Sequence, residues 1–128
     1  MIPFTGLELS PGKAAYLKYL SLQGGSVKIS GIAGYFEVDP STVTRTITDL
    51  TREGYVEHEP YGRVILTEFG RKYGAFLVRR HRILGLVLSH YGLSEEEACA
   101  EASRMECSLS REAVNKICRA LGHPTRGF

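Results

Sequence analysis

The chain has 128 residues, of which 43% are hydrophobic and 23% charged, and its formal net charge is only +2 at pH 7. This composition is typical of a globular protein and argues against disorder, and a nucleic-acid surface would have to come from the placement of basic residues and not from their sum. Because the chain has no apolar run of about 18 residues, no signal-peptide pattern and an odd count of three cysteines, we expect a cytoplasmic protein with free thiols and no membrane partner.

The first predicted helix begins at Ser10, which can act as an N-cap, and has Pro11 at its first helical position. Its apolar pattern continues until Gly24 and Gly25, which end it. A short helix follows at residues 30–36, where apolar side chains recur at helical spacing.

The segment EVDPSTVTRTITDLTREGYVE predicts a third helix with one narrow apolar face. The helix starts in the turn at residues 38–41, its apolar residues Val43, Ile47 and Leu50 recur at i, i+4 and i+7, and Gly54 ends it. The outward positions carry small hydroxyls and arginines, namely Thr42, Thr44, Arg45, Thr48 and Arg52.

Two short β-prone runs, YVEHE and RVILT, follow the third helix and are joined by the turn residues Pro60-Tyr61-Gly62-Arg63. The order of helix, short helix, turn, helix with a polar outer face, and hairpin is that of a winged helix-turn-helix. We therefore predict a winged helix-turn-helix DNA-binding domain over residues 1–66.

The sequence pattern predicts helices throughout the second half of the chain. Thr67 is a good N-cap for a helix of about 25 residues that contains no proline. Ser94 and Glu97 form a capping box for the next helix, and Ser110 caps a last helix that Gly122 ends. Because these amphipathic helices would struggle to bury their apolar faces alone, we expect self-association.

The predicted fold class is therefore mainly α with a small β-hairpin wing. The winged helix-turn-helix of residues 1–66 is followed by a helical dimerisation domain over residues 67–128. As a homodimer such a chain would bind double-stranded DNA at a pseudo-palindrome whose half-sites are spaced by helical turns.

Residues 99–107, CAEASRMEC, raise the question of a metal site. If this whole segment is one helix, Cys99, Ser103, Glu106 and Cys107 fall within an arc of roughly 100°. Their side chains could then converge on one ion. The alternative is that the cysteines pack as small hydrophobic residues in a core.

The recognition helix of a helix-turn-helix offers its first turns to base edges in the major groove. Ser41, Thr42, Thr44 and Arg45 occupy these turns, and Arg45 is the best candidate for a guanine contact. Basic residues nearby are candidates for phosphate neutralisation, namely Lys28, Arg52 and Arg63 of the wing.

Four segments of the chain are distinctive: DPSTVTRTITDLTREGYVE, RRHR in the long helix, Glu-Cys followed by Ser-Leu-Ser, and LGHP near the end. With these segments the chain resembles the diphtheria-toxin-repressor family of metal-dependent transcriptional regulators. The likeness covers most of the chain and corresponds to the two-domain form without an SH3-like domain. The resemblance implies a homodimeric repressor of palindromic operator DNA, in which a divalent metal between the domains sets the DNA-binding geometry.

Position by position, the resemblance places metal ligands at His81 and Glu106. The next position is Cys107, whose thiolate can ligate, and Cys99 falls where some relatives have an ancillary ligand. Ser103 takes a further ligand position and is a poorer donor. A metal site of His81, Cys99, Glu106 and Cys107 suits Fe(II), which we favour, or Zn(II) better than Mn(II), because Mn(II) prefers oxygen ligands.

The chain departs from the family at the first helix. The two ligand positions there fall on Ala15 and Lys18, and Lys18 would repel a cation. The expected function is a metal-dependent, iron-responsive repressor. The alternative is a winged-helix regulator that has lost metal control and responds to thiol redox state or to another ligand.

Other classes of function fit less well. An intrahelical disulfide between Cys99 and Cys107 is excluded if both lie on one helix, because their Cα atoms would be about 12 Å apart. Oxidation would then act between chains or through Cys118. An enzyme is not expected, because the chain has no nucleophile signature and no phosphate-binding glycine loop. A winged helix that binds only proteins would show no affinity for DNA.

Overall fold

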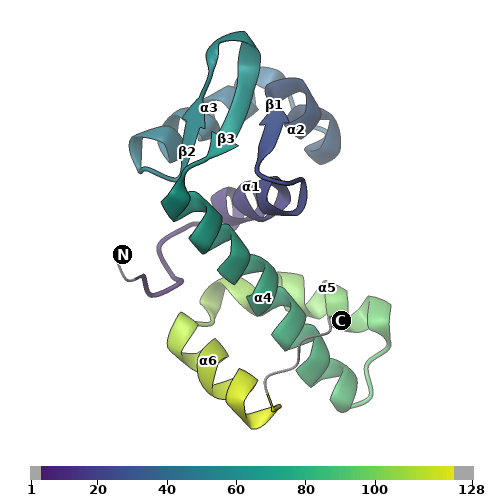
Figure 1. Cartoon of the computed structure of the whole chain (residues 1–128). Coiled ribbons are helices and arrows are strands. Elements are labelled where there is room, and N and C mark those ends of the chain that lie inside the picture. Colours follow the sequence, from purple (N-terminus) through teal and green to yellow (C-terminus); the bar gives the residue numbers. More distant parts are fainter. Residues whose placement is uncertain (1–3, 123–128) are drawn as a thin grey trace.

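The computed structural model describes residues 4–122, so His123 and Pro124 of the LGHP segment lie outside the described residues. The elements are mainly helical, as predicted, with a small sheet (Figure 1). In chain order they are α1 (Pro11–Leu22), β1 (Ser26–Lys28), α2 (Ile29–Phe36), α3 (Pro40–Arg52), β2 (Val56–His58), the 3₁₀ turn η1 (Pro60–Gly62), β3 (Arg63–Leu66), α4 (Glu68–His90), α5 (Glu95–Met105), the 3₁₀ turn η2 (Glu106–Ser108) and α6 (Arg111–Ala120).

The hairpin wing that the sequence predicts is present as β2 and β3, and β1, which the sequence did not predict, adds a third strand to make an antiparallel sheet. Its strand order is β1-β3-β2, with Val27 opposite Val64 and Val56 opposite Leu66. Strand β1 has only three residues, which is too short to show a period of two in the sequence. It forms because β3, once paired with β2, still has a free edge.

The helices of the winged unit, residues 10–66, pack on one apolar core. Leu17 and Leu20 of α1, Ile32 of α2, and Ile47 and Leu50 of α3 are completely buried. The apolar faces predicted for α1 and α3 are therefore the faces that the core uses. Burial of each side chain of this size contributes about 1.5–3 kcal/mol to the free energy of unfolding. Because α3 packs on the core through this face, its other face is left exposed to solvent.

Helix α4 connects the winged unit to the helical part of the chain, residues 68–122 (Figure 1). It packs against α1 along its first half and against α5 and α6 further on. Tyr73, Leu77 and Ile83 are among its buried residues. In the described part of the chain, no helix combines the length and the apolar character that crossing a membrane requires.

The helix predicted for CAEASRMEC is shorter than expected, and this corrects the single-helix interpretation. Helix α5 ends at Met105, and Glu106 and Cys107 lie in η2. The backbone is extended at Leu109 and at Ser110, the N-cap of α6. The turn immediately before them is therefore a tighter 3₁₀ turn and not a continuation of the α-helix. Cys99 and Cys107 consequently do not share one helical face.

The start of α4 is fixed by close contact with the base of the wing. The Thr67 hydroxyl accepts a hydrogen bond from Gly70 N and lies 2.7 Å from the Gly54 carbonyl oxygen. A Cβ atom built on Gly70 would lie 1.9 Å from the Tyr55 carbonyl oxygen. Only glycine fits at this position, so the contact sets where α4 leaves the winged unit.

We expect Gly70→Ala to lower the free energy of unfolding by about 2–3 kcal/mol or more, because the methyl group would force α4 away from the Tyr55 carbonyl. Gly34→Ala in α2 is the matched control. A Cβ there meets nothing within 4 Å, so alanine should raise the same quantity by about 0.5–1 kcal/mol. Urea unfolding of both variants measures this, and equal stabilities would contradict the close approach.

Candidate metal centre and nucleic-acid interface

The outer face of α3 is exposed, as the sequence predicts. Ser41, Thr42, Thr44, Arg45 and Thr48 are all exposed, while the opposite face of the same helix is completely buried. Packing therefore fixes how the helix is rotated. A row of small hydroxyl side chains and one arginine is presented to solvent.

The threonine hydroxyls of α3 are engaged with the helix itself. The Thr44 hydroxyl lies 2.9 Å from the Pro40 carbonyl oxygen, and the Thr48 hydroxyl lies 2.8 Å from the Thr44 carbonyl oxygen. In these bonds the hydroxyls donate to the carbonyls four residues earlier. Their oxygens remain acceptors, so these threonines suit amino groups on base edges, or methyl contacts with thymine, better than they suit phosphate oxygens.

The basic residues predicted to bind DNA differ in the partners that their side chains contact. Arg63 lies opposite Lys28 in the sheet, and its Nε donates to the Ser26 hydroxyl at 3.0 Å. Arg52 is paired with Asp49 one turn earlier on α3. Arg45 has no carboxylate partner within the described residues and is exposed.

A carboxylate in η2 is shared between an ammonium and an imidazole from two other helices. Glu106 Oε2 lies 2.7 Å from Nδ1 of His81 on α4, and Glu106 Oε1 lies 2.9 Å from Nζ of Lys18 on α1. The Glu106 side chain is 10% exposed and that of Lys18 is 22% exposed. This carboxylate therefore joins three segments of the chain at a site that is largely shielded from water.

The pKa of Glu106 is lowered despite its burial. Burial by itself raises the pKa of the carboxyl, but the hydrogen bonds from His81 and Lys18 and the positive charge of Lys18 outweigh burial. Glu106 is consequently a carboxylate at neutral pH. It is available to bind a cation, and the cation that it binds in this structure is an ammonium.

The other ring nitrogen of His81 faces a thiol. Nε2 of His81 lies 3.3 Å from Sγ of Cys99 on α5. With Glu106 accepting a hydrogen bond from Nδ1, the neutral ring leaves Nε2 free to act as a ligand. Carboxylates commonly orient metal-binding histidines in this way, and a sequence pattern alone could not reveal this partner.

Cys107 and Ser103 are directed to other partners. Cys107 Sγ lies 3.8 Å from Nη2 of Arg80, and the Ser103 hydroxyl lies 3.0 Å from the Cys99 carbonyl oxygen. Within residues 4–122, no three His, Cys, Asp or Glu side chains are placed so that they could hold a metal ion. The donors as they stand do not fit an ion, and the four-residue metal set stays a prediction.

Arg80 is a buried residue that the sequence did not single out. It is 2% exposed, and its Nη1 donates to the carbonyl oxygens of Gly6, at 2.9 Å, and Leu109, at 3.1 Å. It thereby ties the N-terminal segment to the turn before α6. The only sequence signal is its place in the RRHR run, where a buried and a solvated arginine look alike.

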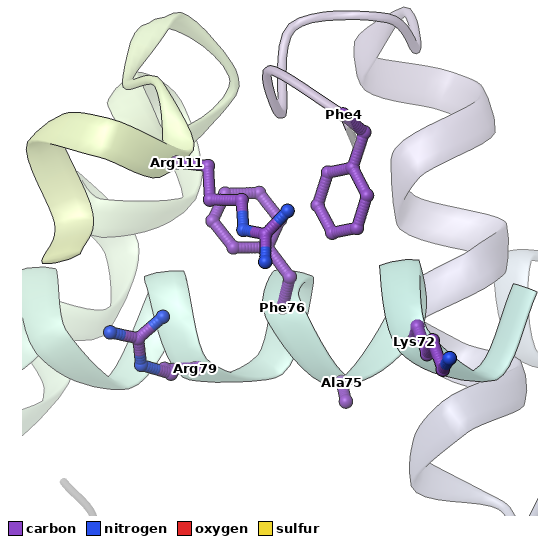
Figure 2. A pocket seen from close by; sticks show the side chains of 6 residues that line it. All are labelled: Phe4, Lys72, Ala75, Phe76, Arg79 and Arg111. Carbon is purple, nitrogen blue, oxygen red and sulfur yellow. The ribbon is translucent and has the colours of Figure 1, made fainter. Parts of the chain in front are cut away.

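Two hollows lie beside these groups. One, of about 240 Å³, lies between α1 and η2, and both Lys18 and Glu106 line it. The other, of about 430 Å³, lies over α4, where Figure 2 shows Phe4, Phe76 and Arg111 gathered together. Its lining residues include cations but no carboxylate, so it offers no site for a metal: Phe4, Lys72, Ala75, Phe76, Arg79 and Arg111.

Comparison with known proteins identifies both halves of the chain. Residues 8–64 match the family model described as the iron-dependent repressor N-terminal DNA-binding domain. Residues 67–127 match that of the iron-dependent repressor metal-binding and dimerisation domain. The HTH-type transcriptional regulator MntR of Geobacillus kaustophilus is 32% identical over 111 residues, which are 84% of this chain and 79% of that protein.

Solved structures agree with this assignment. A hypothetical protein from Sulfolobus solfataricus superposes with a TM-score of 0.76 at 26% identity, over 93% of this chain and 94% of that one. A manganese-dependent transcriptional repressor in complex with manganese superposes with a TM-score of 0.78 at 30% identity. That alignment covers 90% of this chain but 55% of the repressor, which is longer.

The matched family consists of transcriptional regulators and not of enzymes. Its two models meet close to the start of α4, where the winged unit gives way to the helical part. The chain therefore belongs to the iron-dependent repressor family of metal-dependent transcriptional regulators.

Proposed function

We propose that this chain is a homodimeric transcriptional repressor that binds palindromic operator DNA. The observation that carries this proposal is the exposed outer face of α3, held in place by the complete burial of Val43, Ile47 and Leu50 on its inner face. Residues 1–66 form the DNA-binding domain in this proposal, and residues 67–128 form the dimerisation domain.

In this proposal α3 enters the major groove with its N-terminal turns. Arg45 binds a guanine edge, since its guanidinium is not held by a carboxylate of the described residues. Ser41, Thr42 and Thr44 contact neighbouring bases. Phosphates are bound by the basic residues at the edges of this face, Lys28, Arg52 and Arg63.

Exposed apolar side chains in the helical part support self-association. Tyr91 is 77% exposed, Met105 45% and Leu121 40%, and these residues lie at or beyond the ends of α4, α5 and α6. Pairing of two copies through this part would cover them and would place two α3 helices on one DNA duplex.

A divalent transition metal is part of the proposal, as the family description implies. His81 Nε2 and Cys99 Sγ are the pair of donors that already face each other. Glu106 and Cys107, the other two members of the proposed set, would have to leave His81 Nδ1 and Arg80 to reach the same ion. When bound, the ion would stabilise the helical part. Imidazole and thiolate donors favour Fe(II) or Zn(II) over Mn(II), although the relatives include manganese-dependent repressors.

Arg45→Ala should weaken binding to a duplex enriched by the wild-type protein from a random-sequence library by roughly 10- to 100-fold, because one bidentate base contact is lost. Arg119→Ala removes an exposed arginine from α6, far along the chain from α3, and should change affinity less than about twofold. Fluorescence anisotropy at fixed salt compares them, and equal affinities of the two variants would contradict the role of Arg45.

Anaerobic exposure to Fe(II) or Zn(II), followed by desalting, should leave bound metal on the wild-type protein that Cys99→Ser does not retain, because a hydroxyl is a poor replacement for a thiolate. Cys107→Ser tests whether that thiol turns toward the ion. Cys118→Ala, in α6, is the control and should keep its metal. Elemental analysis decides this, and retention of the metal by all three variants would remove these thiols from the site.

A further inference from the structure

The Lys18–Glu106 ion pair joins the winged unit to the helical part. Within the described residues, the other Lys and Arg ion pairs lie inside one unit, as Lys13 with Glu53 and Lys116 with Glu112 do. Lys18 is on α1 and Glu106 is in η2, so this pair links the winged unit directly to the helical part. It is therefore the charged contact that constrains how α1 sits on the helical part.

Its burial makes this pair stronger than a surface ion pair. Both side chains are less than one quarter exposed, so water and salt screen their attraction less than at an open surface. Removing one partner from such a pair leaves a poorly solvated charge, which is strongly unfavourable. The geometry favours one stable arrangement of the two units.

The same pair excludes a divalent cation from the α1 side of Glu106. Lys18 Nζ already lies 2.9 Å from Oε1, and a second cation bound there would be repelled by the ammonium. On α1 the hollow around Glu106 is lined by residues without a carboxylate, imidazole or thiol, namely Pro11, Ala15, Lys18, Tyr19 and Leu22. A metal could therefore not link α1 to Glu106 without displacing Lys18.

We propose that the Lys18 ammonium is the permanent cation that holds the winged unit on the helical part, so that the DNA-binding arrangement does not depend on divalent metal. Metal held by His81 Nε2 and Cys99 would lie between α4 and α5 and would leave this link unchanged. This inference concerns regulation of the proposed repressor, and it rests on the proposed function only where DNA binding is the readout.

The first test is thermal unfolding of the full chain without DNA. Lys18→Met keeps the aliphatic stem and removes the charge, and we expect Tm to fall by roughly 5–10 °C in EDTA because Glu106 loses its ammonium partner and keeps only His81. Lys116→Glu, which reverses an exposed charge in α6, should change Tm by less than about 2 °C. A wild-type Tm for Lys18→Met would overturn the proposal.

The second test reverses the charge. Lys18→Glu places a carboxylate beside Glu106 and His81, which should lower Tm in EDTA and create an oxygen-rich donor set that Mn(II) prefers. Mn(II) should raise the Tm of this variant by roughly 5 °C or more and leave that of the wild type within about 2 °C. An equal Mn(II) shift in the wild type would overturn the proposal, and if Lys18→Glu does not fold, Lys18→Met and the wild-type response decide.

DNA binding gives the functional readout. The wild-type protein should bind its library-enriched duplex equally in EDTA and in Mn(II), whereas Lys18→Glu should bind at least about tenfold better in Mn(II) than in EDTA. Loss of wild-type binding in EDTA would overturn metal independence. If the wild type binds no duplex under any condition, the proposed function fails, and the unfolding measurements still decide whether Lys18 holds the two units together.

Discussion

The Glu106 carboxylate lies where α1, α4 and η2 meet, and in the proposed mechanism the arrangement of the two units depends on how its charge is balanced. Glu106 reaches the Lys18 ammonium with one oxygen and the His81 imidazole with the other. Each bond constrains a different element: Lys18 holds the winged unit, and His81 holds the long helix. A group that is so little exposed cannot remain charged without such partners, which explains why two helices contribute one each.

This arrangement gives a physical link between the exposed helix α3 and the rest of the protein. Helix α4 leaves the wing at the close contact between Gly70 and the Tyr55 carbonyl, and α1 lies along its first half. Because α1 and α3 share one core, a constraint on α1 at Lys18 also constrains the orientation of α3. In a dimer, that orientation determines whether both recognition helices fit successive turns of one duplex.

The family description names metal binding for the helical half, and this chain differs from the family at the α1 ligand positions. On α1, where the resemblance implies metal ligands, it has an alanine and a lysine. What remains near the carboxylate is an imidazole that Glu106 orients toward a thiol, within the helical half alone. The Cys107 thiol contacts Arg80, a buried cation that donates hydrogen bonds to the backbone carbonyls of Gly6 and Leu109. In the proposed mechanism, metal binding and the positioning of the DNA-binding domain are therefore separate.

The sequence by itself determined the fold class, most of the helices and the exposed face of α3, because helix caps and the 3.6-residue period are local signals. It missed β1, which exists only through pairing with β3, and it extended one helix through Glu106 and Cys107, where the start of α6 imposes a tight turn. It named Lys18 and Glu106 separately but could not pair them. These residues are 88 positions apart, and only tertiary packing, which brings α1 beside η2 and shields both side chains from most of the solvent, turns them into one charged link.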